Sequence, residues 1–125
     1  MTPVIYGYSQ EVALDMGLTH DDLLVLHLFN KKRKLLPKQL FEDGIYYCVD
    51  YKSLFAEVPL FKITYSAFRK YRIGNLVKSG VIQREKMQAK GTIIGLRIGC
   101  NYSKLSPQGV YAKELLQKTG DKNIP

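Results

Sequence analysis

The sequence predicts a single domain with a mixed α+β fold. The chain has 125 residues, of which 46% are hydrophobic, enough for one core but not for two independent ones. Segments with the apolar spacing of helices flank a β-rich run, Ile45 to Val49, which follows an Asp43-Gly44 turn signal. Residues 92–98 then alternate between two faces, as a strand does. Helices and strands are therefore interspersed along one compact chain.

Two helices are expected before the first strand. Ser9 is placed to cap a short helix that stops at Gly17. Thr19 is placed to cap the longer segment THDDLLVLHLFNKK, which carries two acids in its first turn and two lysines in its last, as the helix dipole favours. This segment is apolar nearly all round, so we expect it to be the central core helix. The basic run Lys31 to Lys38 is interpreted as a helix end and a solvated loop, or as a second phosphate contact.

Two more helices are expected to meet across a tight turn. YKSLFAEVP is compatible with a short helix ended by Pro59, because proline disfavours a helical conformation in the residue before it. The next helix runs from Tyr65 to Lys78, is capped by Thr64 or Ser66, and ends at Gly80. On a wheel of about 100° per residue, its core side carries Phe68, Ile73, Leu76 and Val77. The opposite side carries Ala67, Lys70, Tyr71, Gly74 and Lys78.

A β-hairpin is expected after this helix, with strands over residues 81–88 and 92–98. Strict alternation along the first strand puts three polar side chains on one face, with two more at the tip. These are Arg84, Lys86, Gln88, Lys90 and Thr92. A last helix is expected over 106–119, with Ser106 as its cap and Pro107 as its first residue. The chain thus divides into a domain over 1–104 and a C-terminal helix and tail over 105–125, a linker to a further domain or a partner-contacting element.

The order helix, strand, helix, turn, helix, hairpin predicts a winged helix-turn-helix, with a three-helix core and a small antiparallel sheet. In a helix-turn-helix the second helix enters the DNA major groove, and here that is the helix from Tyr65 to Lys78. The hairpin is then the wing, which reaches phosphates. The expected DNA contacts are Thr64, Ser66, Ala67, Arg69, Lys70, Tyr71, Arg72, Lys78, Arg84, Lys86, Gln88, Lys90 and Thr92.

Arg69 and Arg72 fit this scheme less well, because they project nearer the core side of the wheel. Three interpretations stay open: the phase of the wheel is shifted, the two arginines reach phosphates from the flank of the helix, or they pair with acids such as Asp50 and Glu57.

The charge pattern favours a polyanionic partner. The formal net charge is +8, and from Leu60 to Lys104 ten cationic residues face only Glu85. Nucleic acid suits such a surface, while a solubilising face that discourages strand-to-strand aggregation would use the same lysines. The chain contains no apolar run of about 18 residues and does not begin like a signal peptide. We therefore expect a cytoplasmic protein that does not bind membranes.

Several motifs extend this interpretation to a family. From DLLVLHLF through YYCVDYKSL and LVKSGVI to KGTIIGLRIGCNYSKL, the chain resembles the N-terminal winged-helix domain of phage and plasmid replication initiators, also called replisome organisers. Arg69 stands where that pattern usually has an aliphatic residue. The resemblance implies duplex DNA binding at an origin or operator inside a bacterial host cell. The matching residues are Tyr46, Tyr47, Tyr51, Lys52, Leu76, Val77, Gly80, Val81, Lys90, Gly91, Thr92, Arg97, Ile98, Gly99, Asn101 and Tyr102.

Enzymatic activity is not expected. The His-Asp pair in THDD lacks the further ligands of a metal site, and the sequence contains neither a phosphate-binding glycine loop nor a recognisable catalytic triad. We expect no cofactor and no metal. The leading hypothesis is double-stranded DNA binding in replication initiation, with a replisome protein as a further partner. The alternatives are a small dimeric transcriptional regulator, which self-associates through the last helix, and a winged-helix protein-interaction module.

Overall fold

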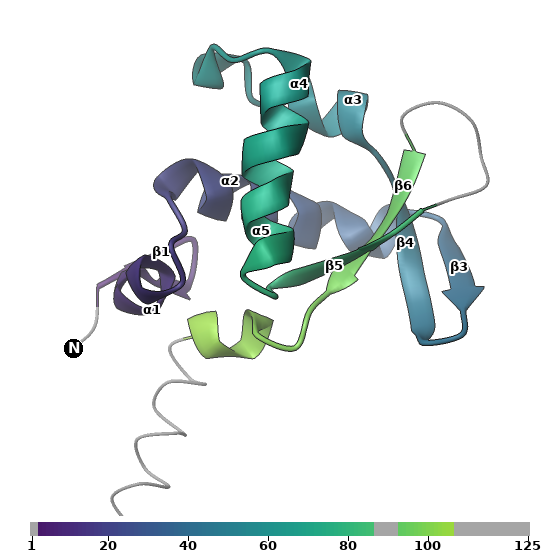
Figure 1. Cartoon of the computed structure of the whole chain (residues 1–125), viewed down its shortest axis with the longest axis horizontal. Coiled ribbons are helices and arrows are strands. Elements are labelled where there is room, and N and C mark those ends of the chain that lie inside the picture. Colours follow the sequence, from purple (N-terminus) through teal and green to yellow (C-terminus); the bar gives the residue numbers. More distant parts are fainter. Residues whose placement is uncertain (1–2, 87–92, 107–125) are drawn as a thin grey trace, which may run out of the picture.

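A computed structural model describes residues 3–86 and 93–106 of the chain (Figure 1). It has a mixed α+β architecture, as the sequence predicts. A four-stranded antiparallel sheet in the order β3-β4-β6-β5 lies beside a group of helices.

The N-terminal part forms a small hairpin and a capped helix. Strands β1 (Val4–Ile5) and β2 (Tyr8–Ser9) pair across a turn in which Tyr6 and Gly7 have φ angles of 54° and 81°. Two successive positive φ angles are typical of the tight hairpin turn whose twist matches that of the strands. Helix α1 (Gln10–Asp15) follows directly, with the Ser9 side chain accepting a hydrogen bond from the Val12 amide. The expected Ser9 cap is confirmed.

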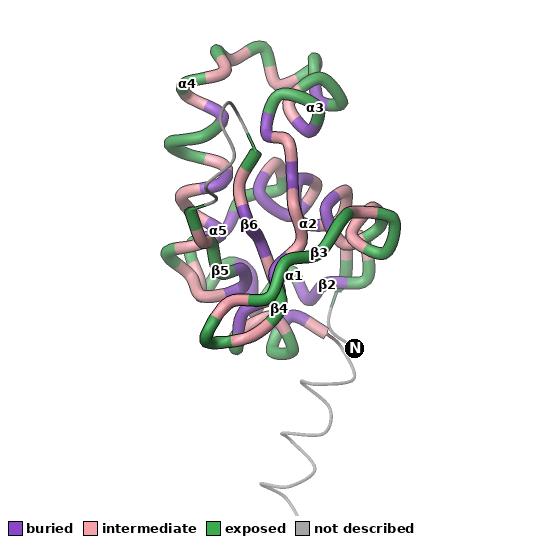
Figure 2. Tube along the Cα trace, turned by 90° about the vertical axis from the view of Figure 1, so that its right-hand side faces the viewer, coloured by how far each residue is buried: buried purple, intermediate pink, exposed green. Residues whose placement is uncertain are grey.

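Helix α2 (His20–Lys32) is the central helix of the core, as expected. Thr19 and Asp22 form a reciprocal capping box, in which each side chain accepts a hydrogen bond from the other residue's backbone amide. Four apolar side chains of α2 are buried: Leu23, Val25, Leu26 and Phe29. The burial colours in Figure 2 show buried segments of α2 lying next to β6.

The sheet contains one strand that the sequence interpretation missed. Strand β3 (Lys38–Phe41) pairs with β4 (Gly44–Asp50) across the expected Asp43-Gly44 turn. The interpretation of this region as a solvated loop is therefore wrong at its end, because Lys38 begins an exposed edge strand. Strand β4 pairs on its other side with β6 (Ile93–Ile98), and β6 pairs with the outer strand β5 (Ile82–Glu85).

The helices between β4 and β5 form a short helix and a long one. Helix α3 (Tyr51–Phe55) ends earlier than expected, and a 3₁₀ turn (Pro59–Phe61) follows. The long helix, hereafter the α4–α5 helix, consists of α4 (Tyr65–Ala67), a π-helical segment η3 (Phe68–Ile73) and α5 (Gly74–Lys78). The cap is Thr64, whose hydroxyl accepts from the Ala67 amide. The predicted core side is confirmed, with Phe68, Ile73 and Leu76 buried and Val77 packed against the core.

The end of the α4–α5 helix is held against the end of β6. Gly80, with a φ of 82°, ends the helix, and its carbonyl accepts from the Asn101 amide. The Asn101 side chain donates to the Ser79 carbonyl at 2.9 Å. A Cβ atom on Gly99 would lie 2.2 Å from the Gly80 carbonyl oxygen, so the two backbones can only meet this closely because Gly99 lacks a side chain.

The packed unit extends through the 3₁₀ turn Tyr102–Leu105, and Leu105 is buried in the core, one residue beyond the predicted domain boundary. The predicted last helix lies outside the described residues apart from Ser106, as do Gln88, Lys90 and Thr92 of the predicted wing. Within the described ranges, every helix is too short or too polar to cross a membrane.

Candidate nucleic-acid interface

A basic groove lies between the α4–α5 helix and strand β5. It has a volume of about 600 Å³, and four of its seven lining residues are cationic while none is acidic. The helix contributes one wall and β5 the other, with α3 and β6 closing the space between them. The lining residues are Tyr51, Ser66, Arg69, Lys70, Arg84, Lys86 and Ile94. Five of the predicted DNA-contacting residues are thus brought together here.

Strand alternation explains why β5 directs its cations toward the helix. Arg84 is paired with Leu96, which is fully buried, and Ile82, two residues earlier on β5, is buried as well. Because successive side chains of an extended chain alternate between faces, Ile82 and Arg84 of β5 share the face that looks toward the helices with Lys86, which directly follows the strand. The buried member anchors the strand, while Arg84 and Lys86 are exposed where the core ends. The predicted grouping of Arg84 with Lys86 agrees with this arrangement.

The helix wall is formed by exposed side chains of the first turns. The guanidinium of Arg69 lies 5.5 Å from the centre of the Tyr65 ring, and the Lys70 ammonium lies 5.4 Å from the centre of the Tyr71 ring. These distances are typical of cation–π contacts, which hold long side chains in place without neutralising their charge. Arg69 is exposed on the groove side rather than turned toward the core.

The π-helical segment shifts the phase of this helix. The Gly74 amide donates to the Arg69 carbonyl, five residues earlier, in place of the four-residue step of an α-helix. A wheel drawn at about 100° per residue therefore loses register within residues 68–73. Arg69, which the wheel placed nearer the core side, is exposed, whereas Phe68 and Ile73 keep their predicted places in the core.

Tyr51 is a groove residue that sequence reasoning did not select as a site. Its side chain is only 5% exposed, and its hydroxyl has no hydrogen-bond partner among the described residues. Burial raises the pKa of this hydroxyl, and the nearby positive charges of Arg84 and Arg69 oppose that rise. Arg84 faces the hydroxyl oxygen as a donor, which also lowers this pKa, so what the described residues lack is an acceptor for the proton of the hydroxyl. A tyrosine at the start of a helix gives no sequence signal for such a role, because only the tertiary fold brings β5 next to it.

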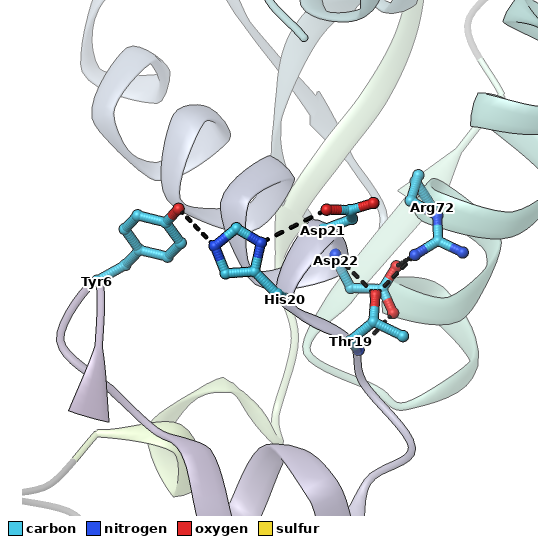
Figure 3. A network of polar contacts seen from close by, with 6 residues as sticks. All are labelled: Tyr6, Thr19, His20, Asp21, Asp22 and Arg72. Carbon is cyan, nitrogen blue, oxygen red and sulfur yellow. Dashed lines mark hydrogen bonds and ion pairs between the residues drawn. The ribbon is translucent and has the colours of Figure 1, made fainter. Parts of the chain in front are cut away.

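Arg72 is directed away from the groove. Figure 3 shows its guanidinium beside the start of α2, where it lies 2.9 Å from a carboxylate oxygen of Asp22 and donates to the Thr19 hydroxyl at 2.7 Å. Asp22 is fully buried and also accepts from Asn75 at 3.2 Å. Pairing with an acid was one of the three interpretations of Arg72. The partner is Asp22, whereas Glu57 pairs with Lys32.

The other predicted contacts of this helix lie outside the groove. Tyr71 is 51% exposed, and Lys78 and Thr64 are also exposed. Ala67 and Gly74 are half-buried on the same helix. The hydroxyl of Thr64 is engaged in capping, so it is a structural residue in this conformation.

Across residues 3–86 and 93–106, no three His, Cys, Asp or Glu side chains gather as a metal site would require. Cys48 and Cys100 are both thiols rather than a disulfide. Neither a family model, nor a curated protein, nor a solved structure matches the chain.

Proposed function

We propose that this chain is the double-stranded DNA-binding domain of a phage or plasmid replication initiation protein, with a winged helix-turn-helix fold. The observation that carries the proposal is the basic groove, in which the helix and hairpin expected to contact DNA present four cations and no acid. The element order supports it too. Strand β4 precedes the two helices and pairs with β6, the second strand of the hairpin, as a wing anchored to the core requires.

In this proposal the α4–α5 helix lies in the major groove, where Lys70, Tyr71 and Lys78 contact base edges or phosphates. The β5–β6 hairpin follows the backbone through Arg84 and Lys86. Contacts to phosphates supply affinity and fix the position of the protein, whereas sequence is read at the base edges. The assignment to replication rests on the resemblance of the sequence motifs to replication initiators.

The proposal is tested by fluorescence anisotropy with labelled duplex DNA across a series of salt concentrations. The variant K70E/K86E removes one cation from each wall of the groove. If both contact phosphates, affinity falls and the log-log salt slope becomes shallower by about 1.8, since each neutralised phosphate contributes about 0.9. The matched control is K62E/K104E, which reverses the same number of charges at two exposed lysines that do not line the groove.

Two results would count against the proposal: absence of duplex binding even at low salt, or equal loss of binding in K62E/K104E and K70E/K86E. Gel-shift assays over fragments of the neighbouring genome test the replication part. Repeated direct sites inside an origin support an initiator, whereas a palindromic site at a promoter indicates a dimeric transcriptional regulator.

A further inference from the structure

We propose that the basic groove holds one particular phosphate of the DNA backbone, and that the Tyr51 hydroxyl donates a hydrogen bond to it. This inference rests on the proposed function and identifies what that site contacts. The inference adds an uncharged residue to a proposed DNA-binding surface that is otherwise identified by its cations.

The first argument is the unpartnered hydroxyl itself. Buried polar groups in folded proteins nearly always have a hydrogen-bond partner, because leaving one without a partner is costly. The Tyr51 hydroxyl is buried and unpartnered within the described part of the chain, yet the residue lines an open groove. A ligand that enters the groove and draws aside the side chains that cover the hydroxyl can supply the missing acceptor.

The second argument concerns the charge of that ligand. Several cations of the described chain have acidic partners: Arg72 pairs with Asp22, Arg97 with Asp43 and Lys32 with Glu57. In contrast, the four groove cations form no ion pair with any described residue. A site with four unpaired positive charges and no acid selects an anion.

The third argument identifies the anion as a phosphate of a polymer. At neutral pH the buried tyrosine keeps its proton and acts as a donor, and the exposed Ser66 hydroxyl adds a second neutral donor on the helix wall. Phosphodiester oxygens accept from hydroxyl and guanidinium donors together. The cations are distributed over both walls of a groove of about 600 Å³, which suits a backbone passing through it better than one small ion.

The central variant is Tyr51→Phe, which removes only the oxygen. The matched control is Tyr65→Phe, because the Tyr65 hydroxyl is likewise buried without a partner but Tyr65 does not line the groove. We expect Y51F to weaken binding to duplex DNA about tenfold or more, as the loss of a hydrogen bond to a charged group does. We expect Y65F to bind like the wild type. A phosphate contact carries no sequence information, so the loss should be equal for specific and random duplexes.

Salt dependence separates the two kinds of donor. Y51F should leave the salt slope unchanged because it removes no charge, whereas Arg84→Gln should make the slope shallower by about 0.9. Duplexes with a single uncharged methylphosphonate, moved along the backbone, locate the phosphate. At the contacted position, wild type and Y51F should bind with equal affinity.

The possible results separate the two proposals. Wild-type affinity of Y51F for duplex DNA, or an equal loss in Y65F, would overturn this inference and leave the proposed function standing. A wild-type chain that binds no duplex would overturn the proposed function and this inference together. Inorganic phosphate, at concentrations near those of the DNA phosphates, is tested as a competitor. If it displaces the duplex, and if Y51F weakens the binding of inorganic phosphate as well, the site recognises a free anion and the polymer assignment fails.

Discussion

The guanidinium of Arg72, in the middle of the α4–α5 helix, lies 2.9 Å from the carboxylate of Asp22 at the start of α2. Asp22 is fully buried, and it also accepts from the backbone of Thr19 and from Asn75. One carboxylate therefore caps α2 and fixes the helix proposed to contact DNA against it (Figure 3). This relationship sets the orientation of that helix relative to the sheet.

Replacing Arg72 by Met should destabilise the fold strongly. The substitution keeps most of the side-chain volume but leaves the Asp22 carboxylate buried without its counter-charge, which costs roughly 3–5 kcal/mol. The free energy of unfolding, measured by denaturant titration with circular dichroism, reports this loss. Lys70→Met on the same helix is the control and should change stability by less than about 0.5 kcal/mol, because Lys70 is exposed. Equal stability of R72M and wild type would show that the ion pair is dispensable.

Alanine substitutions at two glycines should change the stability of the protein in opposite directions. Gly99→Ala should be severely destabilising, because the new methyl group would lie 2.2 Å from the carbonyl oxygen of Gly80, an atom of the backbone. Gly74→Ala should stabilise the protein by about 0.5–1 kcal/mol, since alanine is favoured in helices and its Cβ would meet only an ordinary contact at 3.8 Å. Thermal unfolding of the two variants in parallel checks the prediction, and a destabilised G74A would contradict it.

The protein should lose stability above pH 10. Burial raises the pKa of Tyr8 above its ordinary value of 10.0, and the Tyr102 hydroxyl adds to that rise. Burial raises the pKa of Tyr51 as well. A raised pKa in the folded state means that the unfolded chain loses these protons first, so the stabilisation is complete below pH 10 and falls as the pH rises toward the folded-state pKa values.

Tyrosinate absorbance and unfolding, followed together in an alkaline titration, test this pH dependence. Tyr8→Phe and Tyr51→Phe should each make the fall in stability with pH shallower. Y51F should also be at least as stable as wild type at neutral pH, since it removes an unsatisfied buried group. A steeper fall in either variant would rule out the proposed cause.

Replacing Arg97 by Lys should weaken the outer face of the sheet. The guanidinium lies 4.6 Å from the centre of the Tyr46 ring, donates to Gln83 at 2.6 Å, and bonds the Asp43 carbonyl at 2.5 Å. A lysine ammonium cannot stack and donate in several directions from one plane, so R97K should cost roughly 1–3 kcal/mol. Chemical denaturation measures the loss of stability. The loss in Arg97→Ala, which removes the whole charged group, serves as the reference for the loss in R97K. An R97K variant as stable as wild type would show that charge alone suffices.

Local signals made much of this fold predictable. Ser9, Thr19 and Thr64 each precede an apolar helical pattern, and all three cap the helices expected of them. The Asp43-Gly44 turn likewise lies where the sequence places it. Such features depend on a few neighbouring residues, so they are readable without knowledge of the fold.

The remaining features depend on contacts between distant segments. Strand β3 begins with Lys38 and is exposed, so it lacks the buried alternation that identifies a strand. The assignment of Arg72 required knowing that α2 begins beside it, 50 residues from Asp22 along the chain. Tyr51 and Arg84 line the same groove only because β5 packs beside the helices in the folded chain. No local sequence pattern predicts these contacts between distant segments.

The π-helical segment also bears on how such a domain could diversify. It accommodates one residue more than an α-helix of the same register would, over Phe68–Ile73. Deletion of a single in-frame codon there would restore a regular α-helix, and the turns before and after the segment would keep their relative orientation. Ser66 would then stay beside the groove and Leu76 in the core. One codon gained or lost within the segment could thus change the exposed side chains between them while the core persists.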